Sequence, residues 1–88
     1  MLGSALELDP QVSLRPEPFG ALAYHYRTRR LVFLKHRDVV TVAESLDAHP
    51  TLADALTACG VDRSRWPAFD TAFASLTESE IVRERTAG

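Results

Sequence analysis

Apolar and polar residues alternate through much of the first third of the chain, with the two-residue period of β-strands. One such run, residues 12–15, stops at Pro16 and Pro18, which fix φ and lack the backbone N–H that a ladder needs. Two further runs, residues 21–27 and 30–35, are separated by only two residues, which predicts a β-hairpin. The pattern therefore predicts three short strands in succession before residue 36.

The predicted hairpin carries large apolar side chains on one face and smaller ones on the other. With a two-residue loop at positions 28–29, Tyr24 would face Phe33 and Tyr26 would face Leu31. We expect this aromatic face, which includes Leu22, to be of the kind that packs in a core. The opposite face would carry Ala23, His25, Val32 and Leu34. The strand at residues 31–34 is thus apolar on both faces.

From residue 37 the apolar period changes to that of α-helices. The first helix has the stripe Val39, Val42, Ala43 and Leu46, with Asp38 as the predicted N-cap. A second helix would be capped by Thr51 and end at Gly60. A third would begin after Asp62 or Ser64, with one face formed by Trp66, Phe69, Phe73 and Leu76.

Residues 81–83 predict a brief final strand, whereas residues 1–10 show no clear period and are interpreted as a loosely ordered N-terminal lead-in. Residues 11–85 would then form a single domain. Its predicted fold class is α+β, a winged helix-turn-helix-like arrangement with a three-stranded antiparallel sheet followed by three helices.

The composition bounds the function. An 88-residue chain, 45% hydrophobic with net charge −2, is expected to form one small core with little room for a deep pocket. Its charge argues against electrostatic binding of nucleic acid or a membrane surface. A single cysteine, no apolar run of about 20 residues and no secretory signal together predict a cytoplasmic protein with no transmembrane segment.

The residue types that carry catalysis or bind metals are present but scattered. His25, His36, His49 and Cys59 match no metal-ligand spacing. The acidic residues suggest no acid–base pair, and four dispersed glycines form no phosphate loop. We therefore expect no catalytic residues, no metal and no cofactor.

The strand at residues 31–34 is the most informative segment, because connectivity pairs it on one side and leaves its other edge open. Exposed apolar edges are normally suppressed, so this one indicates a site where a peptide adds as a further strand. The third helix would wall the other side of such a groove. The alternative is a strand buried on both faces, with the helix aromatics in the core.

A winged-helix layout also raises the alternative of a small DNA-binding regulator. A recognition helix needs basic and amide side chains on its exposed face. Here the third helix offers Arg63 and Arg65 and then acidic residues, including Asp70 and Glu78. The basic cluster of residues 27–37 favours instead either a solvated edge or an acidic peptide or protein partner.

The string Leu14-Arg15-Pro16-Glu17-Pro18-Phe19-Gly20-Ala21-Leu22, then Tyr24-His25, Thr28-Arg29-Arg30-Leu31, Phe33-Leu34-Lys35, Gly60-Val61 and Trp66-Pro67, resembles the mycofactocin biosynthesis peptide chaperones. The resemblance runs from about residue 9 to residue 82. More broadly, the chain resembles the RiPP recognition element, a small winged-helix module similar to the pyrroloquinoline quinone biosynthesis chaperone.

The resemblance implies a non-catalytic chaperone that binds the leader of a ribosomally made precursor peptide and presents it to a radical S-adenosylmethionine maturase. In the wider family the leader docks as an added strand beside the third strand and against the third helix. Carried onto this chain, the expected binding residues are Arg30, Leu31, Val32, Phe33, Leu34, Lys35, Arg65, Trp66, Phe69 and Phe73.

Within that set, the backbone of either Val32 and Leu34, or Leu31, Phe33 and Lys35, would pair with the leader. The three aromatic side chains of the third helix would line apolar pockets, and the cations Arg30, Lys35 and Arg65 would attract acidic leader residues. In the absence of peptide, the open edge could also pair two copies of the chain into a homodimer.

Overall fold

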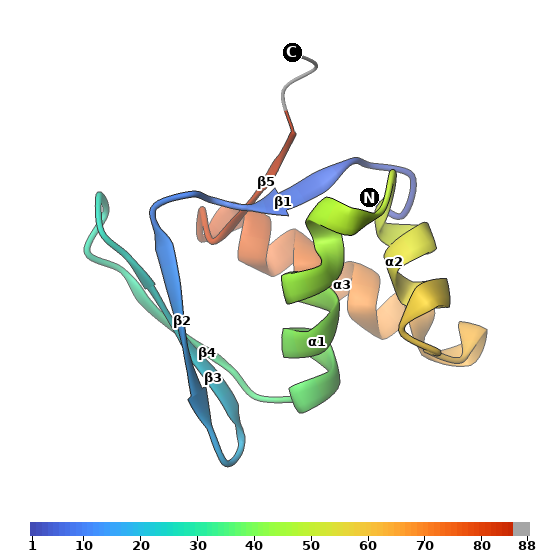
Figure 1. The fold of residues 1–88 in the computed structure, drawn as a ribbon, viewed down its shortest axis with the longest axis horizontal. Coiled ribbons are helices and arrows are strands. Elements are labelled where there is room, and N and C mark those ends of the chain that lie inside the picture. The colour runs from blue at the N-terminus through green and yellow to red at the C-terminus, as the bar shows by residue number, and fades with distance from the viewer. Residues whose placement is uncertain (86–88) are drawn as a thin grey trace.

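The computed structural model describes residues 1–85, which form two small sheets and three α-helices (Figure 1). The strands are β1 (Leu6–Leu8), β2 (Val12–Glu17), β3 (Gly20–His25), β4 (Leu31–Leu34) and β5 (Val82–Glu84). The helices are α1 (Arg37–Ser45), α2 (Leu52–Ala58) and α3 (Trp66–Glu78), with 3-10 turns η1 (Leu46–Ala48) and η2 (Arg63–Arg65).

The predicted fold class is confirmed. Strands β2, β3 and β4 form an antiparallel sheet in the order β2-β3-β4, and the three helices follow it in the chain. The predicted final strand is also present as β5, one residue later than expected at each end. Strand β2 runs through Pro16, which an edge strand tolerates because one side of its backbone needs no partner.

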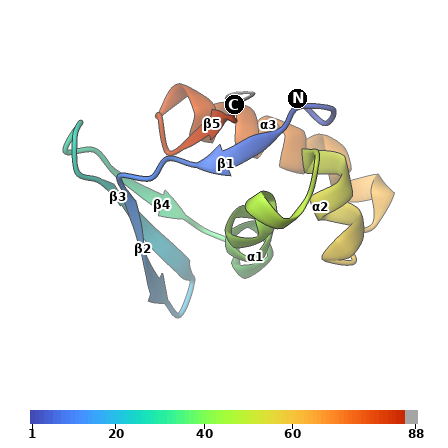
Figure 2. The ribbon, with the colours of Figure 1, turned by 45° about the horizontal axis from the view of Figure 1, so that its top comes forward.

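Part of the segment interpreted as a loosely ordered lead-in is instead a strand. β1 pairs with β5 in antiparallel register, with Leu6 opposite Glu84 and Leu8 opposite Val82. Leu6 is fully buried with Ile81 and Val82 in the core. The sequence pattern misses β1 because its three residues show no period and its partner lies more than 70 positions away. Figures 1 and 2 show this pair beside the helices, apart from the three-stranded sheet.

The register of the β3–β4 hairpin differs from the prediction by two residues. Tyr24 lies opposite Leu31 and Leu22 opposite Phe33, because the loop is five residues long rather than two. Arg29 adopts a left-handed conformation in this loop, with φ of 63°. A two-residue shift keeps each side chain on its predicted face, so the division of the strands into two faces is unchanged.

The prediction of which face is buried is wrong. The face that packs toward α1 carries small or medium side chains, with Ala21, Ala23 and Leu34 buried. The face with Leu31 and Phe33 is exposed to solvent. Close approach of the helix to the sheet leaves room only for small residues, so hydrophobicity alone selects the wrong side.

The helix boundaries follow the predicted caps except at α1. The Thr51 hydroxyl accepts a hydrogen bond from the N–H of Asp54, and Gly60, with φ of 73°, follows the end of α2. Asp62 caps η2, which leads directly into α3. Asp38 is not an N-cap but lies in the first turn of α1, whose N-cap position is His36.

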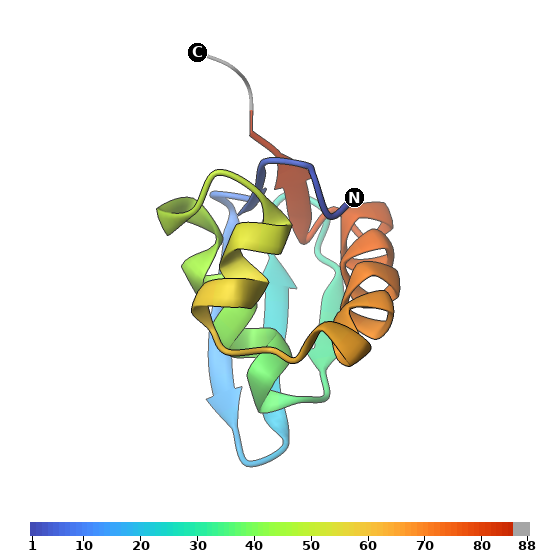
Figure 3. The ribbon, with the colours of Figure 1, turned by 90° about the vertical axis from the view of Figure 1, so that its right-hand side faces the viewer.

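The core lies between the inner face of the sheet, the helices and the β1–β5 pair. Helix α3 runs alongside β4, the last strand of the sheet, on the side away from β3 (Figure 3). At 13 residues, α3 is the longest helix among residues 1–85, and none of the helices described there could span a bilayer.

Candidate functional site

The free edge of β4 carries backbone groups with no partner in the sheet. Strand β4 pairs only with β3, and the N–H of His25 donates to the carbonyl of Arg30 at 3.0 Å. Because hydrogen-bonded pairs alternate along an antiparallel ladder, Val32 and Leu34 also point their backbone groups toward β3. The N–H and C=O groups of Leu31 and Phe33 therefore point outward, away from β3.

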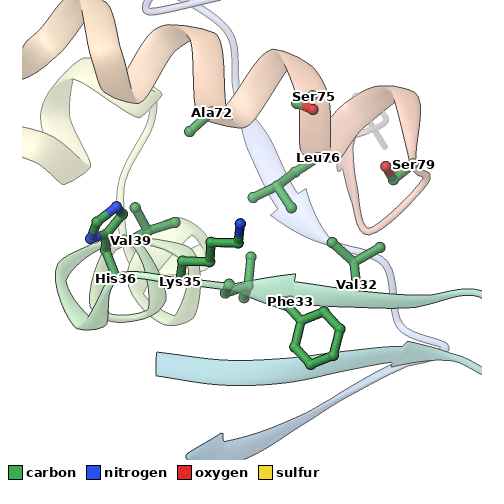
Figure 4. A pocket seen from close by; sticks show the side chains of 10 residues that line it. Val32, Phe33, Lys35, His36, Val39, Ala72, Ser75, Leu76 and Ser79 are labelled. Atoms are coloured by element: carbon green, nitrogen blue, oxygen red, sulfur yellow. The ribbon is translucent and has the colours of Figure 1, made fainter. Parts of the chain in front are cut away.

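A groove of about 240 Å³ separates this edge from α3. Val32, Leu34 and Lys35 line it from the strand side, and Ala72 and Leu76 line it from the helix (Figure 4). The Phe33 ring points away from α3 in Figure 4, which agrees with its place on the outer face. The groove thus presents a strand edge and an apolar wall side by side.

A second hollow shares His36, Val39 and Ala72 with the first and extends it toward the start of α3. Its walls include Asp38 from α1 and Arg65 and Ala68 from the region of α3. Together the two hollows, which we call the β4–α3 groove, run along most of the helix.

Small residues on α3 make room for the groove. The residues that line it include Ala68, Ala72, Ser75 and Ser79, which follow the helical spacing i, i+4, i+7, i+11. The apolar pattern of the sequence does not predict these residues, because the large aromatic side chains of the helix dominate that pattern. A stripe of small residues beside the aromatic stripe is the signal that could have identified the groove.

The predicted aromatic residues of α3 are distributed differently. Phe73 is fully buried in the core, so the structure does not place it as a lining residue. Phe69 is nearly buried but borders the second hollow. Trp66 is half-buried, and its indole N–H donates to the carbonyl of Val61 at 3.1 Å. The aromatic stripe therefore mainly packs α3 against the core.

Arg65 lies at the start of α3 and is already paired. Its guanidinium donates to the carboxylate of Asp38 and lies over the Phe69 ring, 5.2 Å from the centroid. This hydrogen bond holds the pKa of Asp38 below its ordinary value. Because Asp38 neutralises Arg65, the positive charge available to a ligand at this end of the groove is small.

The two cations that flank β4, Arg30 and Lys35, are both exposed. Arg30 lies at the start of the strand, and Lys35 follows its end and lines the groove. The described residues show no cluster of three or more His, Cys, Asp or Glu side chains that could hold a metal ion. What this site offers is unpaired backbone donors and acceptors, an apolar wall and two cations.

These features define a small α+β domain with a free strand edge beside an apolar groove. The sequence profile of the Peptide chaperone MftB family matches residues 5–83. The chain therefore belongs to the peptide chaperone MftB family of mycofactocin biosynthesis, whose members are chaperones rather than enzymes. This assignment confirms the resemblance and favours the peptide-binding interpretation over a DNA-binding regulator.

Individual relatives support the same assignment. "Peptide chaperone MftB" of Mycobacterium ulcerans (strain Agy99) is 45% identical over 75 residues, which cover 85% of this chain and 69% of the relative. "Peptide chaperone MftB" of Mycolicibacterium smegmatis (strain ATCC 700084 / mc(2)155) is 47% identical over 75 residues, covering 85% of this chain and 74% of the relative. Comparison with solved structures gave no significant match.

Proposed function

We propose that this chain binds the leader of a ribosomally made precursor peptide as an added strand on β4, within the β4–α3 groove. In this proposal the bound peptide is then presented to a radical S-adenosylmethionine maturase. The observation that carries it is the outward-facing backbone of β4 beside an apolar groove. Strand addition satisfies backbone groups that otherwise bond only to water.

The register of β4 favours one of the two predicted pairing patterns. Leu31 and Phe33 have outward backbone groups, and Lys35 continues the same alternation. Val32 and Leu34 already pair with β3. We infer that the leader forms its hydrogen bonds with Leu31, Phe33 and Lys35, while its inward side chains contact Val32 and the small residues of α3.

The charges beside the strand indicate what else the leader carries. Arg30 and Lys35 would attract acidic leader residues at the two ends of β4, whereas Arg65 is already occupied by Asp38. Strand addition with a few buried side chains is compatible with a dissociation constant of about 1 μM, or about −8 kcal/mol.

Calorimetric titration of the precursor peptide tests the proposal with a pair of matched variants. Ala72→Trp fills the groove and is expected to weaken binding at least tenfold. Ala74→Trp makes the same change at an exposed position two residues further along α3, away from the groove, and is expected to stay within twofold of the parent. No binding by the folded parent protein, or equal binding by the two variants, would contradict the proposal.

Amide hydrogen exchange gives a test without any substitution. The N–H groups of Leu31 and Phe33 are expected to exchange rapidly in the free protein and slowly with peptide bound. Those of Val32 and Leu34 should be protected in both states, because they donate to β3.

Because free edges also pair copies of one chain, sedimentation should accompany these titrations. The peptide is expected to dissociate any dimer that forms through the edge of β4.

A further inference from the structure

The outer face of the three-stranded sheet, opposite the helices, presents an apolar patch to solvent. Among residues 1–85, five large hydrophobic side chains are exposed to solvent, and four of them lie in this part of the chain. Their exposed fractions are 44% for Phe19, 60% for Tyr26, 53% for Leu31 and 56% for Phe33. We call these four residues, with the half-buried Leu22 and Tyr24 between them, the outer patch.

The aromatic rings of the outer patch pack against one another. Phe19 and Phe33 have ring centroids 5.9 Å apart and tilted by 53°. Tyr24 and Tyr26 meet edge to face at 5.2 Å. Such pairs hold each other in place, so the patch is a preorganised surface. These side chains therefore form a cluster, unlike the singly scattered hydrophobic residues that are normal on a protein surface.

Basic and acidic residues are distributed unevenly between residues 11–37 and the remainder of the chain. Residues 11–37, which form the sheet and its loops, contain six Lys or Arg residues and one acidic residue, Glu17, which pairs with Arg15. The remainder of the chain contains four basic and eleven acidic residues. The apolar outer patch therefore belongs to the basic part of an otherwise acidic protein.

We propose that the outer patch is the surface on which the maturase docks, through an apolar area with an acidic border. This inference rests on the proposed function. A second copy of the chain fits poorly, because two basic faces would repel each other across a symmetric interface. Single-stranded nucleic acid is also disfavoured, since one tilted and one edge-to-face ring pair do not present a flat stacking platform.

The outer patch is continuous with the proposed peptide site. The backbone groups of Leu31 and Phe33 lie on the free edge of β4, and their side chains belong to the outer patch. A peptide added to β4 would extend the sheet. Every second side chain of the peptide would then lie on the outer face, next to Leu31 and Phe33. A maturase on the outer patch would thus contact chaperone and peptide together.

The test compares maturase binding by two double variants with the same added charge. Phe19→Asp/Tyr26→Asp alters the outer patch at positions outside the β4–α3 groove. Thr41→Asp/Thr57→Asp places two carboxylates on exposed positions of α1 and α2. We expect the first variant to bind purified maturase at least tenfold more weakly, with precursor binding within twofold, and the second to match the parent in both assays.

Hydroxyl-radical footprinting of the parent protein gives a readout that does not depend on folded variants. Phe19 and Tyr26 are expected to be protected by the maturase. Unchanged maturase binding by Phe19→Asp/Tyr26→Asp, or no protection of these rings, would overturn the docking surface and leave peptide binding intact. If the parent protein did not bind the precursor peptide, the proposed function itself would be overturned.

Two further outcomes would assign the outer patch to another occupant. A labelled single-stranded oligonucleotide that binds the parent more tightly than the maturase, and is released by Phe19→Asp/Tyr26→Asp, would make it a nucleic-acid surface. Sedimentation showing a parent dimer that the same variant dissociates would make it a self-association surface. Either result would overturn the maturase assignment.

Discussion

At the scale of single residues, His25 connects three parts of the chain. Its Nδ1 accepts the backbone N–H groups of Arg27 and Thr28 at 3.2 and 3.3 Å. Its Nε2 lies 3.4 Å from Asp9 Oδ2, in the segment that precedes β2. A fully buried histidine thus fixes the loop that leads into β4.

Replacing that ring tests its role. His25→Leu places an apolar side chain at the buried site and leaves the N–H groups of Arg27 and Thr28 without their acceptor. We expect the free energy of unfolding to fall by about 1–2 kcal/mol, measured by chemical denaturation. His36→Leu, at an exposed position, should change it by less than about 0.5 kcal/mol. Equal effects of the two substitutions would show that the His25 hydrogen bonds do not stabilise the fold.

Gly20 is required because the backbone of the next strand comes close to it. Its φ is 154°, and a Cβ there would lie 2.0 Å from the carbonyl oxygen of Leu34. Gly20→Ala must push β4 away from β3, and we expect a loss of about 1–3 kcal/mol in unfolding experiments. Gly3→Ala meets no atom within 4 Å and serves as the control. A Gly20→Ala protein as stable as the parent would contradict this close approach.

Sequence patterns predict single residues well where the determinant is local. Thr51 and Gly60 were identified because a helix cap depends on a few neighbouring residues. The sequence pattern predicts the wrong buried face of the sheet, because Ala21 and Ala23 are selected by the close approach of α1, a tertiary constraint. The same limit applies to Ala72, whose importance depends on its position beside β4.

At the scale of elements, the free edge of β4 could be predicted but its register could not. Three consecutive strands pair as neighbours by default, which leaves the last edge open. The register instead depends on the loop, and Arg29 occupies a left-handed conformation that usually indicates glycine or asparagine. Only the structure therefore shows which residues of β3 and β4 lie opposite each other.

The ion pair between Asp38 and Arg65 connects α1 to the start of α3 and should make stability depend on acidity. Because the pKa of Asp38 is lowered in the folded state, its contribution is present above the ordinary aspartate pKa and is lost as pH falls through the folded value. We expect Asp38→Asn to cost about 0.5–1 kcal/mol at pH 6 and almost nothing at pH 2. Glu44→Gln, an exposed change on the same helix, should show no such difference. Thermal unfolding of both variants at the two pH values measures this pH dependence. A cost of Asp38→Asn that persists at pH 2 would contradict a stabilising role for the Asp38–Arg65 ion pair.

At the scale of the whole molecule, the β1–β5 pair completes the core. Leu6 from the first strand is buried with Ile81 and Val82 from the end of the described chain. Leu6→Ala should therefore lower the free energy of unfolding by about 2–5 kcal/mol. Leu31→Ala removes the same atoms from an exposed position and should cost less than about 0.5 kcal/mol in the same denaturation experiment. Similar costs would mean that β1 does not contribute to the core.

The same strand pair determines when the protein can fold during its synthesis. Leu6 is synthesised long before Glu84, its partner in the β1–β5 register, so the two strands cannot pair until β5 has been made. The sheet and helices can form earlier from local contacts, whereas closing a loop of this length comes late. Until β5 has been made, the nascent domain exposes core surface, so the synthesis of β5 decides when this domain becomes resistant to aggregation and proteolysis.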